Sequence, residues 1–302
     1  MHSRRNFLTK SGLLAAGVGT VAEQSLSAQM PRSAADDQFV IQKGHIHQSI
    51  MGWCFKSHFS AVQLAHHCKA LGMVAMEGIP RSAYPEVKKL GLEISLVSSH
   101  SFTQGPCNPK EKDLVIDKLT EAIDVAKQVG CKQVIAFTGM RFDGMDDEKA
   151  AQRCVDVWKK VVPHAEKNNV TITLEQLNSR DHDQAHMKGH PGYFGDDLDF
   201  CVDLINRVGS DHFKLLFDIY HVSIMNGDMI RRIRQYKDVI AHYHTAGNPG
   251  RGELDDTQEI GYPAIMREIL KTGYQGYVAQ EFIPTWDDPV AALRHAVQLC
   301  DV

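Results

Sequence analysis

From residue 40 onward, short apolar or β-branched runs alternate with longer segments of helical periodicity. This alternation is typical of repeated strand–helix units around a parallel sheet. We expect strands at 45–53, 73–79, 93–98, 133–138, 170–177, 213–219, 239–245 and 277–282. Eight such strands close a barrel. The chain is therefore predicted to be an α/β protein, with a single-domain (β/α)8 TIM barrel over residues 38–302.

The segment between the third and fourth expected strands shows the helical pattern clearly. Val115, Leu119, Ala122, Ala126 and Val129 fall on one stripe. Glycines that would end helices follow here and elsewhere, at Gly72, Gly91, Gly130, Gly209 and Gly273. A doubly wound open sheet is the structural alternative. No GxGxxG sequence follows the first strand and no Walker sequence occurs, so the barrel is favoured.

The first residues predict a targeting segment rather than part of the fold. Ser3-Arg4-Arg5-Asn6-Phe7-Leu8 precedes an apolar run too short to span a bilayer, and small residues near Ala28 offer a cleavage site. We interpret residues 1–28 as a cleavable twin-arginine signal peptide and 29–37 as a linker. The alternative is an ordinary basic amphipathic start. The signal predicts an exported, periplasmic protein.

The net charge limits which partners the chain can bind, and the cysteine spacing indicates what the cysteines do. A formal net charge of -4 leaves no positive field for nucleic acid, and no stable membrane insertion is expected. A small-molecule substrate is the expected partner, and a homo-oligomer is left open. The seven cysteines show no CxxC pair, so we interpret them as small core residues, although an oxidising destination would allow a disulfide.

Four ligand-type side chains stand at the ends of four successive strands: Glu175, Asp218, His244 and Glu281. In a parallel barrel the last inward-facing residue of each strand points into the same opening, where such enzymes place their chemistry. Three carboxylates and one imidazole suit Mg, Mn, Co or Zn. A single acidic residue at such a position is more often a helix N-cap or an ion-pair partner. Their coincidence predicts a site for one divalent cation.

Further polar residues surround this predicted site. We expect His221 to contact substrate, with capping of the next helix as the alternative. Arg251, in a Gly- and Pro-rich turn, would grip a substrate carboxylate or hydroxyl unless it is a surface arginine. His242 lies one layer deeper than His244 and would form hydrogen bonds within the site. Glu77 would support the ligands or pair with a nearby lysine or arginine.

Aromatic side chains at or beyond strand ends would supply walls that exclude water, with packing at the rim as an equal alternative: Trp53, His100, Phe102, Phe282 and Trp286. Of these, Trp53 and His100 are predicted to bind substrate.

At these positions the sequence resembles the hydroxypyruvate isomerases of the xylose-isomerase-like barrel superfamily. The resemblance rests on Leu174-Glu175-Gln176-Leu177-Asn178, His190-Pro191-Gly192-Tyr193-Phe194, Phe217-Asp218-Ile219-Tyr220-His221, Pro249-Gly250-Arg251 and Glu259-Ile260-Gly261-Tyr262. It implies a metal held by residues 175, 218, 244 and 281, with Glu175 and Glu281 as the acid/base pair. The chain departs from that family at His244, where the family has glutamine and ketose 3-epimerases have histidine. Gly261 replaces an asparagine, and the export signal is a further departure.

The function that follows is a metal-dependent isomerisation of a small α-hydroxy carbonyl compound. Its expected form is hydroxypyruvate to tartronate semialdehyde (2-hydroxy-3-oxopropanoate), through an enediolate that the cation stabilises while two glutamates move the proton. A ketose 3-epimerase or another sugar isomerase of the superfamily is the first alternative. A non-catalytic exported sugar-binding protein is the second. A nuclease of the superfamily would need a basic groove, against which the near-neutral composition argues.

Overall fold

The computed structural model describes residues 40–180 and 189–302, so the predicted signal peptide and linker lie outside the described residues and stay predictions. The strands are β1 (His47–Ile50), β2 (Ala75–Met76), β3 (Glu93–Ile94), β4 (Gln133–Ala136), β5 (Thr171–Glu175), β6 (Phe213–Asp218), β7 (Ile240–Thr245) and β8 (Tyr277–Gln280). Each lies inside one of the eight predicted strand segments.

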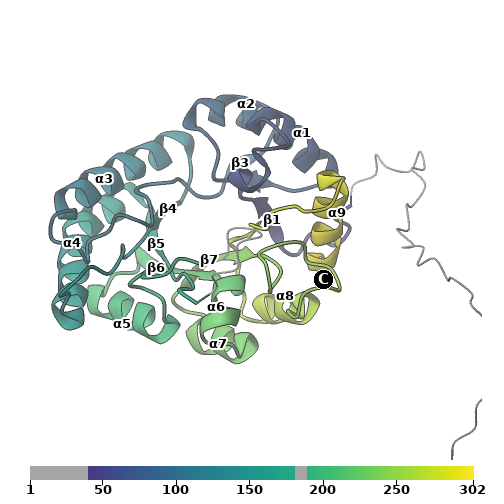
Figure 1. Cartoon of the computed structure of the whole chain (residues 1–302). Coiled ribbons are helices and arrows are strands. Elements are labelled where there is room, and N and C mark those ends of the chain that lie inside the picture. Colours follow the sequence, from purple (N-terminus) through teal and green to yellow (C-terminus); the bar gives the residue numbers. More distant parts are fainter. Residues whose placement is uncertain (1–39, 181–188) are drawn as a thin grey trace, which may run out of the picture. The chain divides into compact units, whose positions relative to one another are not determined.

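Helices follow the strands in the predicted alternation and form an outer layer around them (Figure 1). They are α1 (Ala61–Leu71), α2 (Tyr84–Lys89), α3 (Lys112–Val129), α4 (Asp147–Asn168), α5 (Leu198–Val208), α6 (Ile219–Met225), α7 (Met229–Tyr236), α8 (Tyr262–Lys271) and α9 (Pro289–Cys300). Two short 3-10 turns, η1 (Gly52–Phe55) and η2 (Arg81–Ala83), complete the elements. Gly72, Gly130 and Gly209 end α1, α3 and α5 in the left-handed conformation, as predicted.

The strands close into a ring with two unequal arcs. Six form one parallel sheet in the order β1-β8-β7-β6-β5-β4, and β2 pairs with β3 in a separate two-stranded sheet. Single bridges from Met51 to Glu77 and from Val97 to Val134 join the two sheets. Backbone hydrogen bonds support both joints, including Gly52 N–H to the Glu77 carbonyl at 2.7 Å and Val97 N–H to the Gln133 carbonyl at 3.0 Å. The barrel is therefore closed, and the open-sheet alternative is wrong.

The core lies between the strands and the helices that cover them. Trp158 of α4 is fully buried against Phe213 of β6, with ring centroids 4.8 Å apart. All seven cysteines are buried free thiols, which confirms their interpretation as core residues. Across the part of the chain that the structure describes, no helix is both long and apolar enough to cross a membrane.

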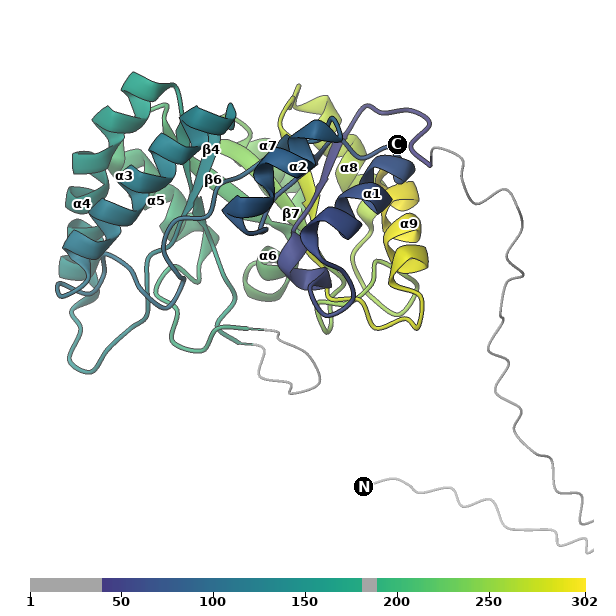
Figure 2. The same cartoon turned by 90° about the horizontal axis from the view of Figure 1, so that it is seen from above.

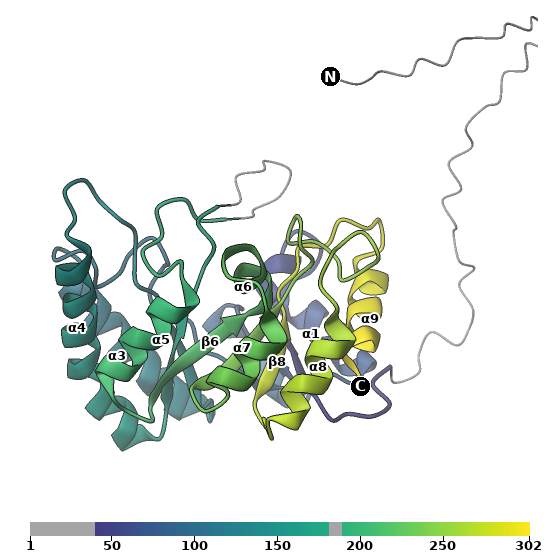
Figure 3. The ribbon, with the colours of Figure 1, turned by 90° about the horizontal axis from the view of Figure 1, so that it is seen from below.

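Long connecting loops gather at one end of the barrel in both side views (Figures 2 and 3). The loops after β3, β5 and β7 belong to this end, because parallel strands all finish at the same side. Capping aspartates start the helices that follow four of the strands at this end: Asp146 starts α4, Asp197 starts α5, Asp218 starts α6 and Asp288 starts α9. This end of the barrel is where the predicted site residues meet.

Candidate metal centre and pocket

Four ligand-type side chains converge at the carboxyl ends of β5 to β8. Glu175 and Asp218 are the last residues of β5 and β6, His244 lies near the end of β7, and Glu281 directly follows β8. The strand register places Asp218 beside His244 in the sheet. One potential ligand atom from each of the four lies within 4.8 Å of the others, and all four residues are buried. The convergence that the sequence predicted is present.

One nitrogen of His244 faces both glutamates. Its Nδ1 lies 2.7 Å from Glu281 Oε2 and 3.1 Å from Glu175 Oε1. Asp218 uses Oδ1 to accept the His221 backbone N–H at 3.1 Å, as the N-cap of α6. Its Oδ2 is buried and has no hydrogen-bond partner among the described residues. A buried oxygen without a donor is costly unless a cation or water meets it. The cluster therefore fits a divalent metal of the Mg, Mn, Co or Zn type.

The pKa values of the carboxyl groups reflect their crowding. Burial raises the pKa of Asp218 to about 8, and the charge of Glu281 adds to this effect. Burial and the same neighbour raise the pKa of Glu175. Burial alone would also raise the pKa of Glu281, but Arg251 and His244 outweigh it and hold that pKa well below its usual value. The three side chains resist carrying three negative charges unless positive charge lies among them.

These shifts predict how the stability of the chelated protein depends on pH. An unfolded aspartate titrates near pH 4 and Asp218 in the fold near pH 8, so between these values the folded state binds the extra proton. Its contribution to the free energy of unfolding is present at low pH and is lost as the pH rises to about 8. We expect denaturant unfolding in chelator to show wild type losing stability relative to Asp218→Asn over this range. Asparagine keeps the N-cap, and parallel stability curves would contradict the prediction.

Glu77 connects the cluster to a second buried layer. It is fully buried in the segment after β2, and its Oε1 accepts a hydrogen bond from His244 Nε2 at 2.8 Å. His242 Nε2 lies 3.0 Å from Glu77 Oε2, and Ser95 Oγ donates to the same oxygen. Among the described residues, the partners of Glu77 are thus two histidines and a serine, so the predicted alternative of a lysine or arginine partner is wrong. Because Glu77 occupies Nε2, Nδ1 of His244 remains as the nitrogen directed at the cluster.

We expect Glu77→Gln to weaken metal binding roughly 10–100-fold, as loss of such a supporting carboxylate does elsewhere. Glutamine keeps the side-chain shape but removes the charge that fixes His244. Metal affinity is measured by competition with a chromophoric chelator. Glu93→Gln is the matched control, because Glu93 lies on the neighbouring strand β3 and is exposed. Equal affinities in wild type and Glu77→Gln would contradict this role.

Arg251 lies beside the cluster and is 2% exposed, so it is not a surface arginine. Its Nη2 lies 2.9 Å from Glu281 Oε2, and its guanidinium carbon lies 5.6 Å from the ring centre of Trp53. The backbone at Arg251 has a φ of 53°, and its carbonyl accepts the Ile283 N–H at 2.8 Å. These contacts fix the arginine over the opening, where sequence analysis placed it.

Two other predicted substrate contacts have different surroundings. His221 lies in the first turn of α6 and is fully buried. Its Nδ1 accepts the Asn178 N–H at 3.1 Å and its Nε2 lies 3.6 Å from Asp218 Oδ2. It therefore borders the four ligand-type side chains and is not among the residues that line the pocket, unlike the substrate contact that we expected. His100 lines the pocket, with Nδ1 2.9 Å from the Gln104 carbonyl.

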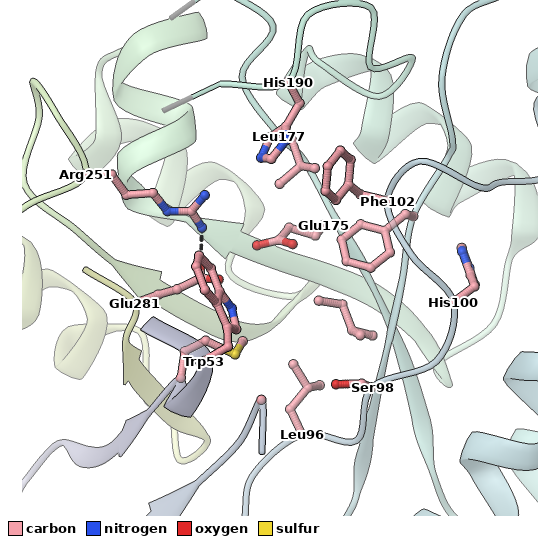
Figure 4. Close-up of a pocket in the computed structure, with 14 residues that line it drawn as sticks. Trp53, Leu96, Ser98, His100, Phe102, Glu175, Leu177, His190, Arg251 and Glu281 are labelled. Carbon is pink, nitrogen blue, oxygen red and sulfur yellow. Dashed lines mark ion pairs between the residues drawn. The ribbon is translucent and has the colours of Figure 1, made fainter. Parts of the chain in front are cut away.

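A pocket of about 380 Å³ opens beside Glu175 and Glu281 (Figure 4). Trp53, His100 and Phe102 line it, as expected. Phe282 does not, because it is fully buried against Phe55, and Trp286 does not, because it packs on His295 at the surface. For these two, packing is the better description. Sequence analysis missed these other lining residues: Met51, Gly78, Leu96, Ser98, Ile135, Phe137, Leu177 and His190.

His190 follows the part of the chain that is not described and packs on Phe102, with ring centroids 4.2 Å apart. Burial, followed by the charge of Arg251, lowers the pKa of His190 to about 4. The imidazole is therefore neutral near pH 7. His190 therefore adds no positive charge beside a substrate at this pH, but its ring can still form a hydrogen bond.

Comparison with known protein families agrees with the barrel. The family described as "Xylose isomerase-like TIM barrel" matches residues 57–300. This chain belongs to the xylose isomerase-like TIM barrel family. The match includes every strand from β2 to β8 and all four residues of the cluster. The superfamily predicted from the sequence motifs is confirmed.

Curated relatives of this xylose isomerase-like barrel carry isomerase names. A putative hydroxypyruvate isomerase of Homo sapiens is 28% identical over 173 residues, which are 56% of this chain and 60% of the human protein. Hydroxypyruvate isomerase of Escherichia coli is 27% identical over 61% of this chain and 70% of its own length. A 2-oxo-tetronate isomerase of Cupriavidus necator is 32% identical over 54% of this chain and 59% of its own length. The matched region thus spans less than two thirds of the human relative.

Solved structures show the same fold at lower identity. An AP endonuclease, family 2, from Brucella melitensis has a TM-score of 0.71 at 20% identity, covering 82% of this chain and 96% of that one. A 3-keto-D-glucoside 4-epimerase from Escherichia coli has a TM-score of 0.69 at 17% identity, covering 83% and 97%. A zinc-containing IOLI protein has a TM-score of 0.61 at 16% identity, covering 84% and 95%. These similarities establish the barrel fold. The reaction has to be inferred from the residues of the site.

Proposed function

We propose that this chain is a metal-dependent isomerase that shifts a proton between carbons of a small α-hydroxy carbonyl substrate. The observation that carries the proposal is the placement of Glu175 and Glu281. Both are buried, both belong to the cluster of four ligand-type side chains, and both line the same pocket. Two carboxylates of unlike environment beside one cavity are the arrangement that proton transfer between neighbouring atoms requires.

Different side chains of the pocket transfer the proton and orient the substrate. One glutamate removes a proton from the hydroxyl-bearing carbon, the other delivers a proton to the former carbonyl carbon, and the hydroxyl proton passes to the former carbonyl oxygen. Arg251 orients the substrate by hydrogen bonds from its guanidinium, which the ion pair with Glu281 and the Trp53 ring hold in place. His100 and His190 offer ring nitrogens to substrate oxygens at the pocket wall. A bound divalent cation would supply Lewis-acid stabilisation of the negative charge that develops on oxygen.

Hydroxypyruvate is the first substrate to test, because two of the compared relatives carry that name. Its product would be tartronate semialdehyde. A ketose 3-epimerase is the second candidate, and His244 favours it, since the sequence resembles that group at this ligand. In an epimerase the second glutamate returns the proton to the opposite face of the same carbon.

The test is a substrate panel with the folded protein in deuterated buffer containing Mg or Zn. Hydroxypyruvate and free ketohexoses are followed by proton NMR, which reports both deuterium incorporation and product. We expect exchange next to the carbonyl with at least one compound, and no exchange after chelation. Binding of a ligand without exchange by any compound would overturn the proposal in favour of a non-catalytic sugar-binding protein.

A further inference from the structure

The pocket beside the two glutamates has two unlike walls. Arg251, Glu281 and Trp53 lie on one side, with Glu175 in the middle (Figure 4). The opposite side carries the polar residues Ser98 and His100, but most of its side chains are apolar: Leu96, Ile135, Phe137, Phe102 and Leu177. This second set, the apolar wall, comes from the segment after β3, from β4 and its end, and from the end of β5. The reacting end of a substrate must meet the first side, so whatever extends from it meets the apolar wall.

The cavity is larger than a three-carbon acid requires. Its volume is about 380 Å³. A molecule such as hydroxypyruvate has the bulk of a few water molecules of about 30 Å³ each, and it fills roughly a third of such a cavity. Cavities of this size ordinarily take larger ligands. The cavity therefore has room for a second part of the substrate beside the apolar wall.

The apolar wall offers a polyhydroxylated tail few hydrogen-bond partners, because Ser98 and His100 are the polar side chains beside it. Leu96, Ile135 and Phe137 offer no polar side-chain atom, so hydroxyl groups against them would lose hydrogen bonds to water without replacement. Aromatic edges dominate instead. Phe137 packs edge-on against His100 with centroids 5.7 Å apart, and Phe102 packs similarly against Phe137 at 6.5 Å. Such an arrangement leaves ring faces and edges for an aryl or alkyl group.

The charges of the pocket favour a neutral ligand. Among the lining residues that the structure describes, Arg251 is the only permanent cation, and it is ion-paired with Glu281. Burial lowers the pKa of both His100 and His190, so neither adds positive charge near pH 7. A bound divalent cation and Arg251 would together carry three positive charges. These balance the three negative charges of Glu175, Asp218 and Glu281. A carboxylate on the substrate would find no surplus positive charge.

We propose that the natural substrate is an uncharged α-hydroxy ketone with a nonpolar substituent, and that this substituent binds against Leu96, Ile135 and Phe137. The inference rests on the proposed function, because it places the hydroxy ketone end at Glu175 and Glu281. It narrows the substrate class from small hydroxy acids to larger neutral ketones.

The test uses two probes that differ only in the substituent, hydroxyacetone and 2-hydroxyacetophenone, together with hydroxypyruvate. Binding to the Mg-loaded protein is measured by calorimetry, and exchange of the carbon-bound protons next to the carbonyl is measured by NMR in deuterated buffer. We expect the phenyl probe to bind at least about tenfold more tightly than hydroxyacetone, since a single methylene in an apolar pocket already contributes about tenfold or more. It should also bind more tightly than hydroxypyruvate.

Phe137→Ala should reduce the ratio of the binding affinity for 2-hydroxyacetophenone to that for hydroxyacetone. Leu177→Ala provides a second variant at the same wall if the first fails to fold. Phe142→Ala is the matched control, because Phe142 is 41% exposed and does not line the pocket. Equal affinity for the two neutral probes, or tighter binding of hydroxypyruvate, overturns this inference and leaves the proposed function standing. Absence of exchange with every compound overturns the proposed function, and the ratio of binding constants still decides the inference about the apolar wall.

Discussion

Glu175→Gln and Glu281→Gln are each expected to lower turnover by roughly 10²–10⁴-fold, the contribution of a positioned acid or base. Glutamine has nearly the same shape and keeps one oxygen that can act as a ligand, but it can neither accept nor release the transferred proton. Both residues are only 4% exposed, so water cannot readily replace their side chains. Turnover of the best compound from the panel is measured at saturating metal, so that weaker binding of the cation is compensated.

Glu86→Gln is the matched control for this pair, since Glu86 lies on α2 at the surface and pairs with Lys89. Its activity should equal that of wild type. Circular dichroism of all three variants shows whether the barrel is intact. Turnover like that of wild type in either Glu175→Gln or Glu281→Gln would refute the assignment of that residue to the proton transfer.

Removing divalent metal with a chelator is expected to abolish activity and to lower the melting temperature. The cluster holds three carboxyl groups and one imidazole within 4.8 Å, and a cation relieves the repulsion among them. Binding to the folded state alone stabilises it by about 4 kcal/mol when the free metal is 1,000 times its dissociation constant. For a barrel of this size, a change of that magnitude in the free energy of unfolding shifts the melting temperature by roughly several degrees. Activity and melting temperature should both return on adding Mg, Mn, Co or Zn.

The control for metal removal is His244→Ala, which deletes one ligand-type side chain from the cluster. We expect its melting temperature to respond little to metal or chelator. A wild-type protein whose melting temperature and activity both ignore chelation, with no metal found by elemental analysis, would show that the cluster is a hydrogen-bonded network and no cation site.

The periodicity of the sequence was sufficient to locate every strand, because each βα unit repeats the same pattern of an apolar run, a helix and a stop. It also located the four converging side chains, since strand ends in a closed barrel point to one place. His221 was placed less well. Asp218 caps α6 directly after β6, so the chain turns into a helix at once and His221 is carried inward.

Other features of the site depend on contacts between distant segments, which no local pattern records. Glu77 precedes His242 by 165 positions, yet the two side chains touch. The neutral state of His190 depends on how deeply its loop is buried and on the nearby charge of Arg251. The apolar wall is made of ordinary strand residues such as Leu96 and Ile135, which look like core until the barrel shows that they face a cavity.

The unequal closure of the ring separates two tasks along the chain. The four ligand-type side chains lie on or directly after β5 to β8, inside the continuous six-stranded sheet, where many ladder bonds keep them in register. Part of the apolar wall, Leu96 and Phe102, instead follows β3, a strand of two residues joined to its neighbour on one side by a single bridge. Laboratory evolution toward new ketones should therefore accumulate accepted changes at residues 96–102 while sparing the chemistry, because that arc can adjust without disturbing the other.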